Sequence, residues 1–381
     1  MPKQEPPVSE RPAAERPPAE RKELRYQSIR ESIRKDIDDG RYAAGVRLPS
    51  DGELGRQFDV SRLTVIRALR DLEQQGLVQR RAGSGTYVRG GGGAATLRTL
   101  VFGLLMPDVS DGEVFQPISQ GIVRAGETLH HRLLWGNAPD SWSDKEHQAE
   151  ELCRYFLERK VDGVFFAPVE LTSNQQDVNR RMVESLAAAR IPIVLVDRDY
   201  LPYPERSAYD LVGIDNHRAG YRMTRHLLDE GARRVAFAFR PGSAATVDSR
   251  KAGYREAMRQ AGLETADFAT DGADLDAVHE RWESLRPDGL VCANDLTAAR
   301  LMQNLLRLGC RIPQDVRMVG INDVKYASFL PVPLTSLRQP CHQIGEEAMR
   351  VMLERLQSPD APVKDVLLDC ELVQRQSCGA V

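Results

Sequence analysis

The sequence lacks the long apolar run that a membrane protein needs. None of its 381 residues belongs to a stretch that approaches the roughly 18 apolar residues of a membrane-spanning helix. The opening residues, MPKQEPPVSERPAAERPPAERKE, contain no apolar core, so they do not form a secretory signal. The six cysteines include no CxxC pair and no regular spacing, which is typical of free thiols in a reducing compartment. We therefore predict a cytoplasmic protein that does not associate with membranes.

The sequence also lacks the residue patterns of common metal and catalytic sites. Its seven histidines are scattered, and no His, Cys and Asp residues cluster at zinc-ligand spacing. It contains no GxSxG motif, no phosphate-binding P-loop and no paired-carboxylate signature. We therefore expect no metal, no cofactor and no enzymatic activity.

The first 95 residues carry a net positive charge and the remainder carries a net negative charge. Residues 1–95 contain 18 Lys and Arg against 14 Asp and Glu, a balance of +4, so a net charge of −3 leaves −7 for the remainder. A basic head on an acidic body suggests an anionic partner for the head alone. Residues 1–22 are rich in Pro, Glu and Arg, a composition that predicts a disordered arm.

Residues 23–89 show the pattern of a winged helix-turn-helix. The segment Leu24–Asp39 has apolar residues at helical spacing. Ser50 and Glu53 form a capping-box sequence before a short second helix, and Ser61 can cap a third. Two short strands around a Gly-Ser-Gly turn then complete a hairpin, the wing.

In such a unit the third helix enters the major groove of DNA and presents its first residues to base edges, while the wing contacts the backbone or minor groove. Arginine can bind guanine with two hydrogen bonds, and serine or threonine can bind a base edge or a phosphate. The alternative is that these arginines are only a solvated helix face. The predicted DNA-binding residues are Ser50, Ser61, Arg62, Leu63, Thr64, Arg67, Arg80, Arg81, Gly83, Ser84 and Gly85.

The segment LPSDGELGRQFDVSRLTVIRALRDLEQQGLVQRRAGSGTYV resembles the GntR-type DNA-binding domain, and the resemblance covers residues 24–89. LPS, VSRxTV, GLV and GxGTYV occur in the family's order. Gly52 and Ile66 stand where that family usually has arginines that contact DNA. The resemblance implies binding to double-stranded operator DNA, and the two departures leave the operator sequence unassigned.

Residues 90–97, GGGGAATL, predict a flexible linker to a larger body. In the body, short apolar runs alternate with amphipathic stretches, a pattern that indicates α/β architecture with parallel, doubly wound sheets. The length of the body, 98–376, is suited to two lobes. The predicted strands are Val101–Met106, Val164–Ala167, Ile193–Val196, Val235–Phe239, Gly289–Ala293 and Val316–Ile321.

Polar side chains follow several of these strands, where ligands bind in such sheets. Their carboxylates, amides and guanidinium groups can bridge hydroxyl groups, and an aromatic ring can stack on a sugar face. The alternative is that each Asp or Asn is a turn residue or helix cap. The sequence thus predicts a sugar-like effector bound by Phe115, Asp197, Arg198, Arg250, Asn294, Asn322 and Asp323, with Arg250 at the start of a helix.

Eight blocks in order, among them GLLMPD, VDGVFFAP, IPIVLVDR, GLVCAND and PLTSLRQP, resemble the ligand-binding domain of LacI/GalR repressors. The resemblance implies two lobes joined by three crossovers, the first of about 98–213 and 340–367 and the second of about 214–339 and 368–376. It adds Gln339 to the ligand-binding residues. Asn322 departs from the family's GFD pattern, and Asp323 follows it. A GntR-type head with this body is similar to arabinose-type repressors.

These features predict a homodimeric transcriptional repressor whose operator affinity is controlled by a sugar-like effector. We expect the effector to lower operator affinity and so relieve repression, although a corepressor would use the same parts. A dimer is expected because one helix-turn-helix reads too few bases. Three alternatives stay open: a regulator with a protein or other non-sugar effector, a sugar-transport binding protein, and an enzyme. The missing secretory signal argues against the second, and the missing catalytic motifs argue against the third.

Overall fold

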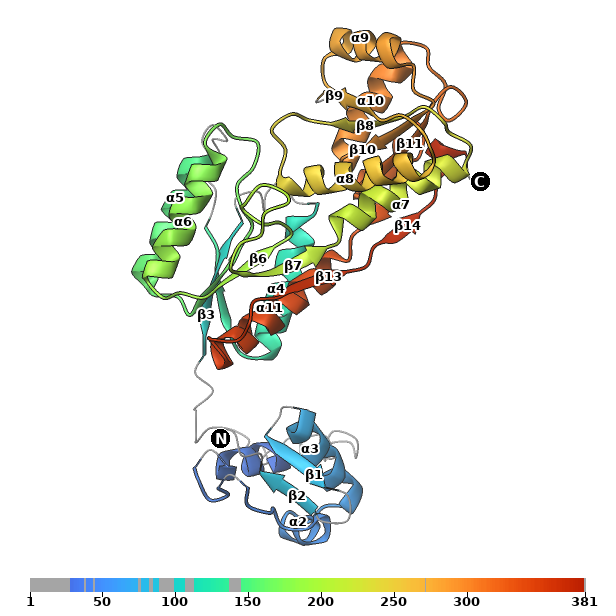
Figure 1. Cartoon of the computed structure of the whole chain (residues 1–381). Coiled ribbons are helices and arrows are strands. Elements are labelled where there is room, and N and C mark those ends of the chain that lie inside the picture. The colour runs from blue at the N-terminus through green and yellow to red at the C-terminus, as the bar shows by residue number, and fades with distance from the viewer. Residues whose placement is uncertain are drawn as a thin grey trace, which may run out of the picture. The chain divides into compact units, whose positions relative to one another are not determined.

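The computed structural model describes residues 28–37, 39–43, 45–74, 77–81, 85–88, 99–106, 113–136, 145–270 and 272–379, with the side chains of Gln74 and Arg81 excepted. The chain divides into two compact units, which are residues 1–98 and 99–381 (Figure 1). We call them the head and the body.

The head contains a helix over 28–37, α2 (Asp51–Gln57), α3 (Arg62–Gln74) and an antiparallel hairpin of β1 (Val78–Arg81) and β2 (Gly85–Val88). The predicted capping box is present, because Ser50 Oγ accepts from the Glu53 amide and the Glu53 carboxylate accepts from the Ser50 amide at 2.7 Å. Apolar side chains at helical spacing pack together in the core. They are Ile29, Ile33, Leu54, Val65, Leu69 and Leu72, joined by Leu48, Val78 and Val88.

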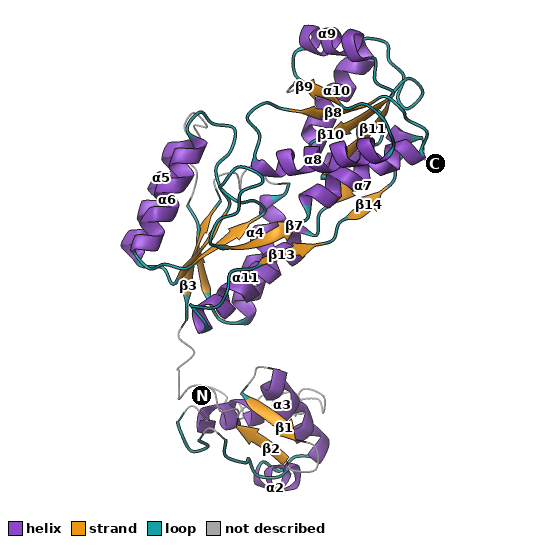
Figure 2. Ribbon diagram, in the orientation of Figure 1, coloured by secondary structure: helices purple, strands orange, loops and turns teal. Residues whose placement is uncertain are grey.

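The body contains two six-stranded sheets, each covered by helices on both faces (Figure 2). We call the parts built on them lobe 1 and lobe 2. The strands of lobe 1 are all parallel and lie in the order β13-β7-β6-β5-β3-β4. Their bounds are β3 Val101–Leu105, β4 Arg132–Leu134, β5 Gly163–Phe166, β6 Ile193–Val196, β7 Asp210–Ile214 and β13 Asp365–Leu368.

Lobe 2 has the order β14-β12-β11-β10-β8-β9, in which β14 alone is antiparallel to its neighbour. Its strands are β8 Val235–Phe239, β9 Ala266–Ala269, β10 Gly289–Cys292, β11 Arg317–Asn322, β12 Thr335–Arg338 and β14 Glu371–Val373. The chain passes between the lobes after β7, after β12 and after β13. The predicted fold class, a winged helix-turn-helix followed by a two-lobed α/β domain, is confirmed.

The helices of each lobe form two pairs around the sheet (Figure 1). In lobe 1, α5 (Lys145–Arg159) and α6 (Gln175–Ala188) pack together, as do α4 (Phe115–Thr128) and α11 (Cys341–Gln357). In lobe 2, α7 (Asn216–Asp229) packs on α8 (Ala245–Gln260), and α9 (Leu275–Leu285) packs on α10 (Asp295–Arg307). Short 3-10 helices occupy Lys325–Ser328 and Gln376–Cys378.

One helix boundary was predicted wrongly. Arg250 was expected to begin a helix, but α8 begins at Ala245 and Arg250 lies in its second turn. The helix starts earlier because Ala244 is the extended N-cap residue and nothing in the following ATVDSR segment interrupts helical geometry. In this position Arg250 is buried.

Glycines allow α4 and α11 to pack backbone against backbone. A Cβ atom on Gly121 would lie 2.2 Å from the His342 carbonyl oxygen, which is too close for any real contact. Replacing Gly121 with alanine is therefore expected to destabilise the body by about 1–3 kcal/mol. Gly126→Ala on the same helix is the matched control, because its Cβ would meet the flexible ends of Met349 and Leu133 and lie 4.0 Å from the His131 Cβ. Urea unfolding followed by far-UV circular dichroism measures both, and equal midpoints would contradict the prediction.

Candidate DNA-binding and ligand-binding sites

The start of α3 presents an exposed polar surface with one apolar residue. Ser61 caps the helix, with its Oγ 3.3 Å from the Thr64 amide and 2.8 Å from Thr64 Oγ1. Arg62 and Arg67 are exposed, and Leu63 is 77% exposed despite being apolar. Arginine, threonine and an apolar side chain at the first turn of such a helix match the donors and the thymine-methyl contact that major-groove recognition uses.

The wing joins this surface through an acidic residue at the start of α2. Asp51 Oδ2 lies 2.5 Å from Arg80 Nη2 and 3.9 Å from Arg62 Nε. The carboxylate therefore holds one guanidinium group from the wing and one from α3 on the same side of the head. Of the other predicted wing residues, Gly83, Ser84 and the side chain of Arg81 lie outside the described residues.

Gly85 is needed at the base of the wing for a steric reason. Its φ is +117°, and a Cβ there would lie 2.6 Å from Arg47 Nε. Arg47 also pairs through its backbone with Tyr87, so it runs along the edge of the hairpin. Arg47 thus adds a third guanidinium group to the surface that Arg62 and Arg80 form, and sequence reasoning missed it.

The two departures from the GntR pattern are both at the described surface of the head. Gly52 is exposed, and a Cβ there would meet no heavy atom within 4 Å. Ile66 is half-buried. Neither side chain supplies a donor for DNA. Exposed arginines on α2, α3 and the described part of the wing are Arg56, Arg62, Arg67, Arg70 and Arg80, and Arg47 lies beside the hairpin.

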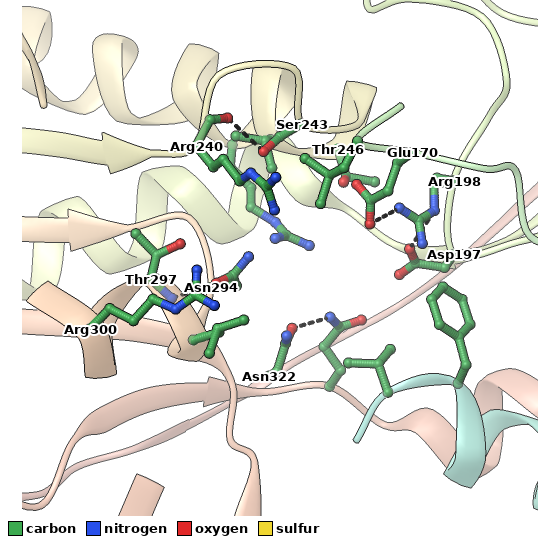
Figure 3. Close-up of a pocket in the computed structure, with 17 residues that line it drawn as sticks. Glu170, Asp197, Arg198, Arg240, Ser243, Thr246, Asn294, Thr297, Arg300 and Asn322 are labelled. Carbon is green, nitrogen blue, oxygen red and sulfur yellow. Dashed lines mark hydrogen bonds and ion pairs between the residues drawn. The ribbon is translucent and has the colours of Figure 1, made fainter. Parts of the chain in front are cut away.

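The body has a pocket between its two lobes, beyond the carboxyl ends of the strands (Figure 3). Its volume is about 130 Å³, below the roughly 300–1,000 Å³ of pockets for drug-sized ligands, so it suits a small molecule. Seven of the eight residues predicted from the sequence line it. These are Phe115, Asp197, Arg198, Arg250, Asn294, Asn322 and Gln339.

Lobe 1 contributes a buried ion-pair chain to the pocket. Arg198 pairs with Glu170, and its Nε lies 3.4 Å from Asp197 Oδ2. The guanidinium group also lies 5.0 Å from the centre of the Phe115 ring. Burial would raise the pKa of Glu170, but Arg198 and the Ala244 amide hold that pKa below its usual range. Burial raises the pKa of Asp197, and Arg198 and Arg250 oppose that shift.

Lobe 2 contributes Arg250, which is 5% exposed. Its Nε donates to Asn216 Oδ1 at 2.8 Å, and its Nη1 donates to the Ala293 carbonyl at 2.7 Å. Burial lowers the pKa of Arg250, while Asp197 from the other lobe raises it. Two hydrogen bonds thus fix this guanidinium group between α7, α8 and the end of β10.

Two amides and a helix cap complete the polar lining. Gln339 Nε2 donates to Asn322 Oδ1 at 2.7 Å, and the buried Oε1 atom of Gln339 has no hydrogen-bond partner within the described residues. Asn322 has a φ of +117°, a conformation that costs about 1–3 kcal/mol and persists mainly at binding sites. Asn294 caps α10 through Oδ1, so the helix-cap alternative holds for that oxygen, and its amide group remains for a ligand.

The comparisons with known proteins agree with this architecture. Residues 25–88 match the model of bacterial regulatory proteins of the gntR family, and residues 224–378 match that of a periplasmic-binding-protein-like domain. The chain joins a GntR-type DNA-binding domain to a periplasmic-binding-protein-like domain.

Relatives with known functions match most of the chain. The arabinose metabolism transcriptional repressor of Geobacillus stearothermophilus is 27% identical over 93% of this chain and 97% of its own length. The ribose operon repressor of Escherichia coli K12 is 29% identical over 74% of this chain and 82% of its own length. The structure of the transcriptional regulator CelR with cellobiose has a TM-score of 0.62 at 23% identity, covering 84% of this chain and 91% of that one.

One predicted ligand-binding residue of the periplasmic-binding-protein-like domain does not reach the pocket. Asp323 turns away and pairs with Arg338 at 2.8 Å and Arg375 at 2.6 Å. These two arginines neutralise the Asp323 carboxylate. Asp323 therefore does not supply the negative charge that an aspartate at position 322 would bring to the pocket. We therefore leave Asp323 out of the proposed site.

Several lining residues were missed by sequence reasoning. Arg240 directly follows β8, so inspecting the residue after that strand would have found it, whereas Glu170 lies four residues beyond the end of β5. The others lie in loops or in the first two turns of helices, and sequence alone does not direct these toward the pocket. They are Ser243, Thr246, Thr297 and Arg300, with the apolar Val114, Leu171, Val247 and Leu296.

Within the described ranges, no helix has both the length and the apolar character to span a bilayer. The same residues bring together no group of three or more His, Cys, Asp or Glu side chains suited to a metal ion.

Proposed function

We propose that this protein is a transcriptional repressor of carbohydrate-utilisation genes whose operator affinity is controlled by a sugar-like effector. The observation that carries the proposal is the match to an arabinose repressor along 93% of this chain and 97% of the relative. A match of that extent supports the same pairing of DNA-binding and ligand-binding domains. The ribose operon repressor, another relative, supports a pentose or a similar polyol as the ligand class.

The pocket lining supports this ligand class on chemical grounds. Asp197 accepts hydrogen bonds, Arg250 donates them from a fixed position, and Asn294, Asn322 and Gln339 can do both. Neighbouring hydroxyl groups of a sugar need such alternating donors and acceptors. A protein effector is less well supported, because the lining surrounds a volume of only about 130 Å³.

Relief of repression requires that the effector bind more tightly to the form that does not hold the operator. A coupling of about 1–3 kcal/mol is typical, and it changes operator affinity about 5- to 150-fold. Because the pocket is lined from both lobes, ligand binding would change the equilibrium between their arrangements. We propose that this change relieves repression.

We further propose a cytoplasmic homodimer without enzymatic activity. Two copies of the head would read two half-sites about 10 base pairs apart, centre to centre, or a multiple of that spacing. The repressor functions of the two relatives support a non-enzymatic role.

The proposal is tested with the full chain in two steps. Duplexes bound by the protein are first selected from a random library and sequenced. Their affinities are then measured at fixed salt with and without L-arabinose, D-ribose, other sugars, sugar phosphates, nucleosides and amino acids. A two-fold symmetric site whose affinity falls at least about fivefold with one sugar is the expected result. Failure to enrich any duplex would contradict DNA binding, and an operator that responds only to a nucleoside or amino acid would contradict the sugar class.

A further inference from the structure

The pocket contains more positive than negative charge. Four arginines and two carboxylates line it, so the charged groups sum to +2. Both carboxylates, Glu170 and Asp197, already face Arg198 within lobe 1. Arg250 donates hydrogen bonds to Asn216 Oδ1 and to the Ala293 carbonyl. The excess charge therefore belongs to lobe 2.

Arg240 and Arg300 carry this excess. Arg240 directly follows β8, and Arg300 lies in the second turn of α10. Neither guanidinium group makes a hydrogen bond or an ion pair with any residue in the described part of the chain. Both point into the pocket from the side of lobe 2 (Figure 3). Two uncompensated arginines on the wall of a small pocket would repel each other unless an anion lies between them.

The neighbouring groups are suited to the same anion. Helices α8 and α10 both begin at this wall, and a helix N-terminus favours negative charge. The N-cap of α8, Ala244, offers no side-chain cap. The hydroxyl groups of Thr246 and Thr297 also line the wall and can donate to oxygen atoms of an anion.

We propose that the effector is an anionic sugar, a polyol with one phosphate or carboxylate group, and that Arg240 and Arg300 hold this group. Its hydroxyl groups would lie toward Asp197, Asn322 and Gln339, where the buried Gln339 Oε1 lacks a donor. The inference rests on the proposed function, since it names the chemical class of the same effector.

The test compares charged and neutral members of matched sugar sets on the full chain. The probes are D-glucose, D-glucuronate and D-glucose 6-phosphate, then D-ribose and D-ribose 5-phosphate, with L-arabinose and sodium phosphate alone, all at one ionic strength. Thermal unfolding ranks them and isothermal titration calorimetry gives Kd. An anionic probe should bind at least about tenfold more tightly than its neutral parent and than free phosphate, because charge-assisted hydrogen bonds are the stronger kind. Comparing glucuronate with glucose 6-phosphate, which both carry the anionic group at C6, distinguishes a carboxylate from a phosphate.

Two variants then test whether Arg240 and Arg300 hold the anionic group of the effector. R240Q and R300Q should each weaken the anionic probe by roughly tenfold or more and leave the neutral parent nearly unchanged. R307Q is the matched control, because Arg307 is an exposed arginine on the same helix α10 but outside the pocket. Arg240 is exposed, so R240Q tests the proposal even if R300Q unfolds.

Three results would overturn the inference. Equal or tighter binding of a neutral parent would leave the proposed function intact and reject only the anionic class. Tight binding of an anionic probe that R240Q and R300Q reduce no more than R307Q would reject the assigned residues. Operator binding that no sugar of either kind affects, with no shift in thermal unfolding, would reject both this inference and the sugar effector.

Discussion

Replacing Arg62 or Arg67 with alanine is expected to weaken operator binding by about 1–3 kcal/mol each, roughly 5- to 150-fold. Both side chains are exposed on the first two turns of α3, which is the helix that enters the major groove in this type of domain. If one binds a base edge, its loss should also relax sequence preference at one operator position. If one binds a phosphate, its loss should lower the slope of affinity against salt by about one unit.

The measurement is fluorescence anisotropy with the selected operator and with a scrambled duplex at several salt concentrations. Arg70→Ala provides the matched control, because Arg70 is exposed on the same helix but follows its first two turns. If Arg62→Ala and Arg67→Ala bound the operator as tightly as Arg70→Ala, α3 would not be the recognition helix. The surface around Arg47 and Arg80 would then be the site to test.

The head could be predicted closely because its signals are local. The capping box at Ser50 and Glu53, the cap at Ser61 and the apolar spacing of Val65, Leu69 and Leu72 each depend on residues a turn or two apart. Arg47 was missed because its position depends on a pairing with Tyr87, forty residues away, and on the open space at Gly85.

In the body, the sequence predicted β3, β5, β6, β8, β10 and β11, which all lie inside the two sheets. It missed the four edge strands, β4, β9, β13 and β14, and the interior strands β7 and β12. The runs that form β5, β6 and β10 are buried at every position and contain only apolar residues and glycine. By contrast, β4 and β14 have three residues each, with charged residues at exposed positions. A three-residue strand carries too little periodicity to be recognised, and its existence depends on the neighbour that it pairs with.

The ligand site could be predicted where it follows a strand and not where it depends on a helix face. Asp197, Asn294 and Asn322 were found by position at strand ends. The correct role of Asp323 required knowledge that Arg338 and Arg375 lie beside it. Thr246 and Arg300 reach the pocket only because α8 and α10 begin at its wall, which no local pattern indicates.

Replacing Arg250 with methionine is expected to abolish the response of operator binding to the effector and to leave ligand-free operator binding in place. Methionine retains much of the side-chain volume but removes every donor, so Asn216 Oδ1 and the Ala293 carbonyl lose their partner. The buried Asp197 also loses a compensating positive charge from the other lobe. Effector affinity should fall by about a hundredfold or more, because a ligand would have to bind beside unpaired buried polar groups.

The variant is measured by the same anisotropy titration, with the sugar that most stabilises the wild-type chain added at increasing concentration. Arg259→Met is the matched control, because Arg259 is an exposed arginine in the last turn of the same helix α8. Thermal unfolding of both variants establishes that the body is folded at the assay temperature. The loss of two buried hydrogen bonds is expected to lower the free energy of unfolding of the Arg250 variant by about 2–4 kcal/mol.

A folded Arg250→Met protein that still released its operator at the wild-type sugar concentration would show that the effector does not bind in this pocket. One that no longer bound the operator without sugar would show that Arg250 sets the DNA-competent state itself, so that the division of roles between head and body would be wrong.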